Sequence, residues 1–153
     1  SCLEKSYSIS DSLHNMNLIC LALDKLIEVE EQLAPDTALK YAKALVKMYD
    51  SMPNVSIYNK VAARLRLCDN FMFVDSLRQA LCEGQIALKL AMKDADRNLY
   101  SFVCQDLANV YEKVGEKDSC LFYARQAYSS NGTDRLSCQL MLASAYISVD
   151  SID

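Results

Sequence analysis

Small and apolar residues recur along this chain in two patterns that alternate strictly. The first pattern is a small residue, Leu, two variable residues and a second small residue, so both small residues lie on one face of a helix. It occurs at Cys2–Ser6, Ala38–Ala42, Ala87–Ala91 and Cys120–Ala124. The second pattern is a large aliphatic residue followed by Ala, with an apolar residue three positions later in most copies. It occurs at Leu21-Ala22, Val61-Ala62-Leu65, Leu107-Ala108-Tyr111 and Leu142-Ala143-Tyr146.

The clearest sequence repeat is between residues 107–111 and residues 142–146, which lie 35 positions further on. A repeat near this period is typical of a stacked helix-hairpin solenoid, in which each unit buries its apolar face against its neighbours. The sequence therefore predicts an all-α, right-handed superhelical solenoid of antiparallel hairpins with about eight helices. We expect it to form a single domain over residues 1–153. Its close helix contacts are expected at Ala108, Ala124 and Ala143, and its core is expected to include Tyr111 and Tyr146.

One interval breaks the regularity. Ala62 and Ala87 are 25 positions apart, whereas 12 positions separate Ala108 from Cys120. We interpret the additional residues, which include the apolar run 71–74, as a backward extension of the second helix of that hairpin. Such an extension is compatible with ordinary core packing, with a cap on the edge of the stack or with a dimer contact.

Composition supports long helices. The 153 residues are 52% hydrophobic and 24% charged, which excludes a disordered tail. Gly and Pro together number only five, against roughly 18 at average usage. The turns that these residues and short polar side chains predict include helix N-caps at Asp36 and Asn54 and a left-handed helix exit at Gly115.

Charge is distributed unevenly. Residues 1–35 carry six acidic residues against two lysines, and residues 37–66 carry six basic residues against one Asp. Two readings remain open, namely solvated helix faces that complement each other and a basic patch for an acidic peptide. The overall net charge of -4 argues against direct contact with nucleic acid.

Seven cysteines are spread along the chain without a close pair. An odd number prevents complete internal pairing, and a chain with its own core does not need a disulfide framework. We expect free, buried thiols. The longest uncharged run has 14 residues, from Leu136 to Val149, which is short of the ~20 that span a bilayer. A cytoplasmic location is slightly favoured for this segment, and a periplasmic one is compatible.

The sequence contains no recognisable motif for catalysis, metal binding or nucleotide binding. His14 is the only histidine, and no nucleophile motif adjoins it. Spacings such as CxxC or HExxH are missing, and the three glycines are not clustered. The sequence therefore predicts no catalytic residues, no metal site and no cofactor.

The repeat resembles the tetratricopeptide repeat (TPR) family, in a degenerate form of the kind found in bacterial regulators. The best-matched unit has Leu107, Ala108 and Tyr111 in its first helix, Gly115 in the turn, and small residues in its second helix at Cys120, Ala124 and Ala127. Earlier units are spaced by 40 and 46 residues, and Trp is absent. The resemblance implies a concave groove lined by the first helices. In this register the residues expected to line it are Asn59, Arg66, Gln105, Asn109, Glu112, Lys113 and Ser144.

These observations predict a protein- or peptide-binding scaffold, the interaction module of a larger bacterial regulatory or signalling protein of which this chain is a fragment. The alternative is a peptide-sensing domain that controls an attached transcription-regulator or kinase output. An enzyme is the remote alternative. A homodimer is compatible with the pattern, and the lysines Lys40, Lys43 and Lys47 are the competing binding surface.

Overall fold

The computed structural model describes residues 13–130 and 135–150 of the chain. These residues form seven α-helices and contain no β-strand. The helices are α2 (Leu13–Leu33), α3 (Pro35–Ser51), α4 (Ile57–Phe73), α5 (Leu77–Ala91), α6 (Arg97–Val114), α7 (Lys117–Ser129) and α8 (Arg135–Asp150). The helix expected near Cys2 lies outside the described residues.

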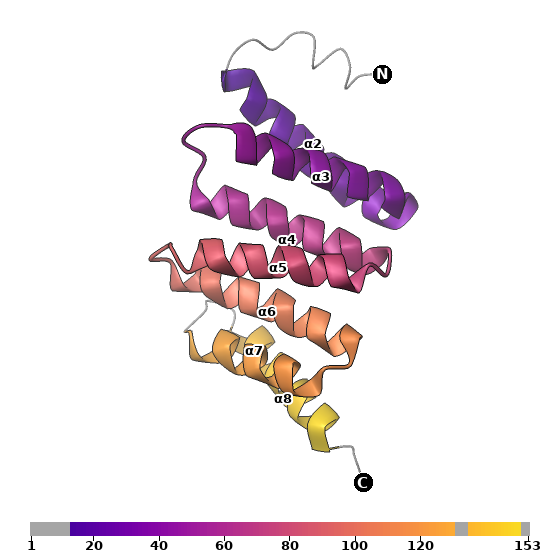
Figure 1. The fold of residues 1–153 in the computed structure, drawn as a ribbon, viewed down its shortest axis with the longest axis vertical. Helices are drawn as coiled ribbons and strands as arrows, with labels where there is room; N and C mark the ends of the chain where they lie inside the picture. The colour runs from indigo at the N-terminus through magenta and orange to yellow at the C-terminus, as the bar shows by residue number, and fades with distance from the viewer. Residues whose placement is uncertain (1–12, 131–134, 151–153) are drawn as a thin grey trace.

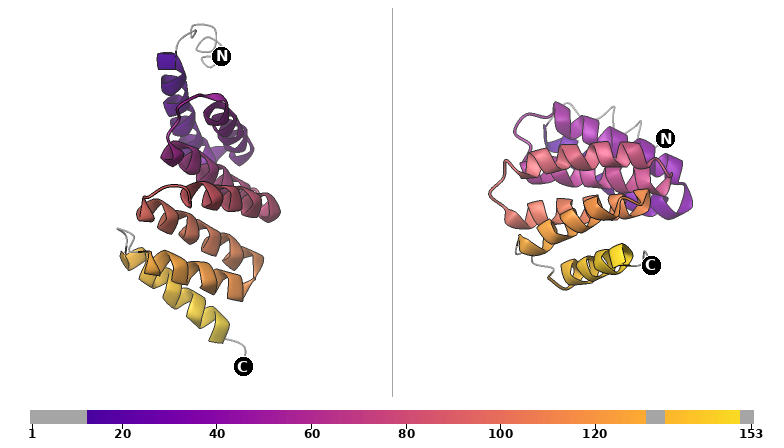
Figure 2. Two further views of the ribbon diagram at one scale, coloured as in Figure 1. Left: turned by 60° about the vertical axis from the view of Figure 1, so that its left-hand side comes forward. Right: turned by 60° about the horizontal axis from the view of Figure 1, so that its bottom comes forward.

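The helices stack in chain order as antiparallel hairpins (Figure 1). The pairs α2/α3, α4/α5 and α6/α7 make the most extensive contacts, and α8 packs on α7 at the far end of the stack. Figure 2 shows the same progression from two other directions, with α2 and α8 at opposite ends of the stack. The predicted all-α solenoid of helix hairpins is confirmed.

The second helices α3, α5 and α7 share one internal register. Each buries a small residue at its fourth position and another four residues later. These pairs are Ala38 with Ala42, Ala80 with Gly84, and Cys120 with Ala124. In α5 the sequence pattern was therefore assigned two turns too late, because residues 80–84 carry the same small-Leu-x-x-small pattern as Ala87–Ala91.

The first helices require a matching correction. Ala62 is exposed, whereas Ala63, Leu67 and Cys68 are buried. Leu67 and Cys68 therefore occupy in α4 the positions of Leu107 and Ala108 in α6. The assignment of Val61-Ala62-Leu65 was wrong because a small residue next to an aliphatic one occurs twice within this helix.

The corrected register removes the irregular interval. Twelve positions separate Cys68 from Ala80, as they separate Ala108 from Cys120. The apolar residues 71–73 end α4, and Val74 is its C-terminal cap. The prediction that this run lengthens the second helix backwards is therefore wrong.

Small side chains allow the hairpins to approach closely. A Cβ built on Gly84 of α5 would lie 2.7 Å from Leu107 Cδ2 of α6 and 3.8 Å from Cys68 Sγ of α4. Ala108 and Ala124 are both fully buried, as predicted. The interface between the second hairpin (α4/α5) and the third (α6/α7), which we call the second joint, is therefore closely packed.

The expected burial of Ala143 and Tyr146 in α8 is wrong. Ala143 is exposed, and Tyr146 is 42% exposed and accepts hydrogen bonds from the guanidinium of Arg125 at 2.8 and 3.0 Å. Ala143 corresponds to Ala108, whose face is covered by α7, and no described helix covers that face of α8. Ala145 takes the buried position instead.

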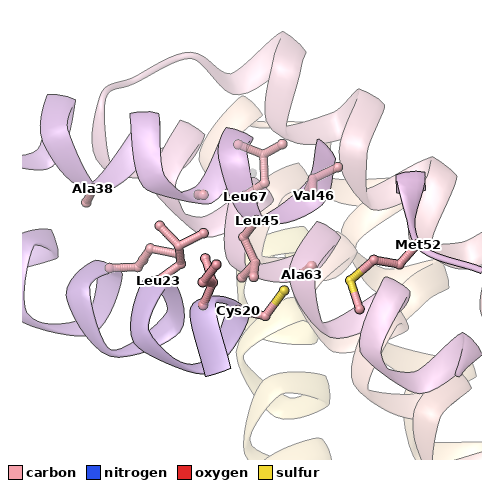
Figure 3. Close-up of a cluster of buried hydrophobic side chains, with 11 residues drawn as sticks. Cys20, Leu23, Ala38, Leu45, Val46, Met52, Ala63 and Leu67 are labelled. Atoms are coloured by element: carbon pink, nitrogen blue, oxygen red, sulfur yellow. The ribbon is translucent and has the colours of Figure 1, made fainter. Parts of the chain in front are cut away.

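The first hairpin packs on α4 through apolar side chains. Figure 3 shows Leu23 of α2, Leu45 of α3 and Leu67 of α4 in one buried cluster. The six cysteines in the described part of the chain are free thiols, and all but Cys82 are buried. The exposure of Cys82 corrects the expectation that every thiol is buried.

The residues that cap the helices differ in part from those predicted. Ser56 caps α4 by accepting a hydrogen bond from the Asn59 amide at 3.1 Å, while Asn54 lies in the preceding turn with φ 62°. Asp36 lies in the first turn of α3 rather than at its cap. Gly115 ends α6 in the left-handed conformation with φ 84°, as predicted. No helix in the described ranges is both long and apolar enough to cross a membrane.

Candidate functional site

We call the side of the stack formed by α2, α4, α6 and α8 the first-helix face. A hollow of about 440 Å³ lies on this face between α2 and α4. Its walls include Leu21 and Tyr58, which are 62% and 57% exposed, and the exposed residues Asn59 and Ala62. Apolar side chains with this exposure, next to polar groups, are typical of a contact surface.

A second hollow of about 270 Å³ adjoins the first. It is lined by Glu31 of α2, by Asp69, Met72 and Phe73 of α4, and by Lys113 of α6. Asp69 lines both hollows. We call these two hollows together the recess, since they share Asp69 and are lined by residues of three successive first helices.

Arg66 is the cation of this recess. Its Nε lies 3.3 Å from Asp24 Oδ1, and its Nη1 lies 3.7 Å from Glu31 Oε1. Both carboxylates belong to α2, so the arginine ties the first hairpin to the second. These pairs join the acidic run 1–35 to the basic run 37–66, as the complementary-face reading of the charge pattern predicts.

A second arginine of α4 is also paired. Arg64 makes ion pairs with Asp50 of α3 and, at 2.7 Å, with Glu83 of α5. Lys43 lies over the ring of Phe71 at 5.2 Å. Lys40, Lys43 and Lys47 are exposed on α3. The competing basic surface is thus reduced to these lysines, since both arginines of α4 are neutralised by carboxylates.

Two carboxyls, one on α4 and one on α6, have raised pKa values. Burial raises the pKa of Asp69, and the neighbouring Glu31 raises it further while Arg66 opposes the shift. Burial also raises the pKa of Asp106, and Asp69 adds to the rise. Asp69 lines both hollows, whereas Asp106 lines neither. Asp69 is therefore the carboxyl of the recess, and Arg66 is the cation that acts on it.

Asn70 adds an unsatisfied group beside this pair. Its side chain is fully buried, and its Nδ2 donates to Glu31 Oε1 at 3.2 Å and to the Arg66 carbonyl at 2.8 Å. Its Oδ1 has no hydrogen-bond partner in the structure. Asn70 holds Glu31 against α4 and so fixes one wall of the second hollow.

The residues predicted to line a single groove fall into two groups. Asn59 and Arg66 line the first hollow, and Lys113 lines the second. The others lie further along α6 and on α8. Gln105 Nε2 donates to Cys138 Sγ at 2.7 Å, and Ser144 Oγ donates to Glu112 Oε1 at 3.4 Å. These three side chains therefore link α6 to α8.

Asn109 is the last of the residues that were predicted to line the groove. It is partly exposed on α6 and corresponds to Asp69 of α4 in the 40-residue register. In the same register Asp106 corresponds to Arg66. The sequence analysis overlooked Asp69 and Asp106 because its register for α4 was shifted. Aligning Cys68 with Ala108 would have placed both carboxylates on the first-helix face.

The described residues were also compared with the arrangements that hold a metal ion. In residues 13–130 and 135–150, no group of three His, Cys, Asp or Glu side chains is placed to hold a metal ion. His14 lies in the first turn of α2, not in the inter-helix turn suggested by its sequence neighbours. The recess offers charge, apolar walls and hydrogen-bonding groups, which are the elements of recognition.

The fold and the recess define a helical-hairpin repeat protein with an acidic, partly apolar concavity on its first-helix face. The structure is similar to two crystal structures of a putative kinesin light chain from Podosopora anserina with nearly identical TPR-like repeats. The TM-score is 0.74 for both, and the sequence identities are 14% and 16%. The match covers 84% of this chain and 66% of each solved chain, just under two thirds of their length.

These comparisons show that the fold is TPR-like. No family model matches the sequence. No curated protein matches it either. The likeness to the solved chains therefore concerns the arrangement of the hairpins, and the residues of the recess must be interpreted on their own chemistry.

Proposed function

We propose that this domain is a protein- or peptide-binding scaffold and that its binding site is the recess around Asp69. The observation that carries the proposal is the pair of hollows lined by residues of α2, α4 and α6, which share Asp69, with Leu21 and Tyr58 exposed at the wider one. A TPR-like stack offers such a surface because its first helices line one side.

The size of the recess favours an extended segment as its occupant. Hollows of about 440 and 270 Å³ lie near the lower end of ligand pockets, about 300–1,000 Å³. Each has room for one or two side chains and not for a folded domain. A peptide that crosses α2, α4 and α6 would place successive side chains in the two hollows.

The domain is then expected to act as the interaction module of a larger regulatory or signalling protein. A peptide sensor is the second candidate, and the position of the first hollow favours it. This hollow has walls from α2 and from α4, which belong to successive hairpins. A peptide bound there would contact both hairpins and would bias the angle between them, which an attached output domain could read.

The proposal is tested by selecting phage-displayed random dodecapeptides on the immobilised domain and titrating labelled copies by fluorescence polarisation. Ala62→Trp adds a large side chain to the wall of the first hollow and should weaken binding at least tenfold. Ala143→Trp is the matched control, since it makes the same change at an exposed position of α8. Circular dichroism should show the same helicity in both variants.

Equal binding by wild type and Ala62→Trp would mean that the peptides use another surface. Replacement of Lys40, Lys43 and Lys47 by Gln then identifies the alternative. Loss of binding in that triple variant alone would assign the site to the basic surface of α3 and would reject the recess.

A further inference from the structure

We infer that the exposed face of α8 is a self-association surface, on which α8 of a second copy of this chain packs in the antiparallel direction. This helix forms the end of the stack opposite α2 (Figure 1). We call its four exposed apolar residues the α8 stripe, namely Leu136, Leu140, Ala143 and Ile147. The surface is separate from the recess, and the inference does not depend on what the recess binds.

The α8 stripe is an apolar line on the outside of the fold. Leu136, Leu140 and Ile147 are 66%, 65% and 70% exposed, and Ala143 is exposed as well. Successive members are four, three and four positions apart, which is the spacing of a seam between two helices. No charged residue occurs from Leu136 to Val149. Large apolar side chains gathered in this way are typical of an interaction surface.

The earlier first helices show what kind of element covers such a stripe. The positions equivalent to 136 and 143 are buried in both, as Val61 and Cys68 in α4 and as Ser101 and Ala108 in α6. Later helices of the stack cover them. Ser101 Oγ lies 3.8 Å from Cys138 Sγ of α8, and Ala108 packs in one cluster with Cys120 of α7 and Ala145 of α8. The α8 stripe therefore continues a series of helix-packing surfaces, and a helix is the element that fits it.

The arrangement of large and small residues favours a second α8 as that helix. A two-fold axis between positions 141 and 142 exchanges position 136 with 147 and position 140 with 143. Leu140 of each copy would lie against Ala143 of the other, and Leu136 against Ile147. A large side chain opposite a small one lets two helices interdigitate, and the uncharged sequence brings no like charges together. A two-fold contact of this kind closes after two copies.

The other end of the stack is less suited to packing on α8. Leu18 and Val29 of α2 are each 58% exposed. Lys25, which lies between them in the sequence, forms an ion pair with Glu28 at 2.7 Å. Covering this surface with an apolar helix would remove both charges from water, which costs free energy. A contact between two copies of α8 is therefore favoured over a head-to-tail contact of α8 with α2.

Sedimentation equilibrium of the whole 153-residue chain in reductant tests the inference. Reductant ensures that disulfides between copies contribute nothing. One helix from each copy buries less surface than the roughly 1,200–2,000 Å² of a standard interface. We therefore expect a dimer with a dissociation constant of about 10–100 µM, which is observed between about 1 and about 300 µM protein.

Two charged variants test the antiparallel pairing. Leu140→Glu and Ala143→Lys should each weaken dimerisation by about tenfold or more, because a charge would be buried at the contact without a partner. An equimolar mixture of the two variants should associate within about threefold of the wild-type affinity. In the mixed dimer the introduced carboxylate lies against the introduced ammonium, and the other half of the contact keeps the native Leu140 and Ala143.

Leu18→Glu is the matched control, because it makes the same change at an exposed leucine of α2. It should change the dissociation constant by less than about twofold. Circular dichroism establishes that each variant has the helicity of the wild type. Ala143→Trp should also dissociate the dimer. Peptide titrations and unfolding experiments below about 1 µM protein report on the monomer, in which this position is exposed.

Three outcomes would overturn the inference. A chain that is still monomeric at the highest concentration would show that a second copy does not cover the α8 stripe. Full dimerisation of Leu140→Glu, or failure of the mixed variants to associate, would reject the antiparallel pairing. Masses that rise beyond two copies and fall in Leu18→Glu would assign the contact to a head-to-tail chain from α8 to α2.

Discussion

Replacing Gly84 by Ala tests the contact that sets the spacing between the second and third hairpins. Gly84 is buried in α5, and an added Cβ would lie 2.7 Å from Leu107 Cδ2 and 3.4 Å from Leu107 Cγ. Carbon atoms in contact prefer about 3.5–4.0 Å. The Leu107 side chain would therefore have to withdraw by about 1 Å, and it is fully buried with other core residues around it.

Two effects of opposite sign contribute to the result. Ala is a better helix former than Gly by about 1 kcal/mol in a helix interior. Overpacking a well-filled core costs about 1–3 kcal/mol. We therefore expect a decrease in the free energy of unfolding of up to about 2 kcal/mol. A loosely packed interface would instead give an increase of about 1 kcal/mol.

Denaturant unfolding followed by circular dichroism measures this difference in a double-mutant cycle with Leu107→Ala. Leu107→Ala alone should cost about 2–5 kcal/mol because it leaves a cavity. In that background the added Cβ meets only Cys68 Sγ, at an ordinary contact distance of 3.8 Å, so Gly84→Ala should stabilise the protein by up to about 1 kcal/mol. The coupling energy between the two sites should accordingly be on the order of 1–3 kcal/mol. If Gly84→Ala stabilises both backgrounds equally, the close contact and the corrected register of α5 are refuted.

Three further measurements test other features. Ala108→Leu should lower the free energy of unfolding by about 1–3 kcal/mol, because Ala108 is fully buried, whereas Ala143→Leu at the exposed equivalent in α8 should change it by less than about 0.5 kcal/mol; equal effects would contradict the repeat register. Thiol titration after denaturation without reductant should count all seven cysteines, and of the six described thiols Cys82 should react first in the folded protein because the other five are buried; five or fewer thiols would indicate a disulfide. Burial raises the pKa of Asp106 from 3.8 to about 8, so the folded state binds more protons than the unfolded state between these values, and the free energy of unfolding should fall as pH rises through this window; Asp106→Asn should flatten that fall, and an unchanged pH profile would show that Asp106 is not responsible.

The fold could be predicted from the sequence because its determinants are local. The alternation of two helical patterns, the scarcity of Gly and Pro, and the echo between residues 107–111 and 142–146 each report the burial of one helix face. Buried positions recur at a regular spacing along each helix. This spacing can be recognised in the sequence even when the residue types at those positions vary. The class of fold follows from it, and seven of the eight predicted helices lie in the described part of the chain.

The register within α4 and α5 could not be predicted in the same way. Val61-Ala62 and Leu67-Cys68 both place a small residue after an aliphatic one, and α5 contains two small-residue patterns, at residues 80–84 and 87–91. Choosing between them requires knowledge of which face meets the next hairpin, and this is a tertiary property. Requiring the same twelve-residue hairpin spacing throughout would have favoured Cys68 with Ala80.

The recess was predicted only in part. Asn59, Arg66 and Lys113 do line it, because a first-helix position facing outward is recognisable once the helix is known. Asp69 was missed, since its place in both hollows depends on how α2, α4 and α6 pack against one another.

The two joints between successive hairpins differ in their mechanical character. At the joint between the first and second hairpins, Arg66 bonds to α2 across a hollow of about 440 Å³. At the next joint, Gly84 lies so close to α6 that a single methyl group has no room. Ion pairs of exposed residues are weakened by salt, and dry contacts between close-packed residues are not. Added salt should therefore weaken the polar part of the first joint, which lies beside the apolar cluster of α2, α3 and α4, and should leave the second joint unchanged.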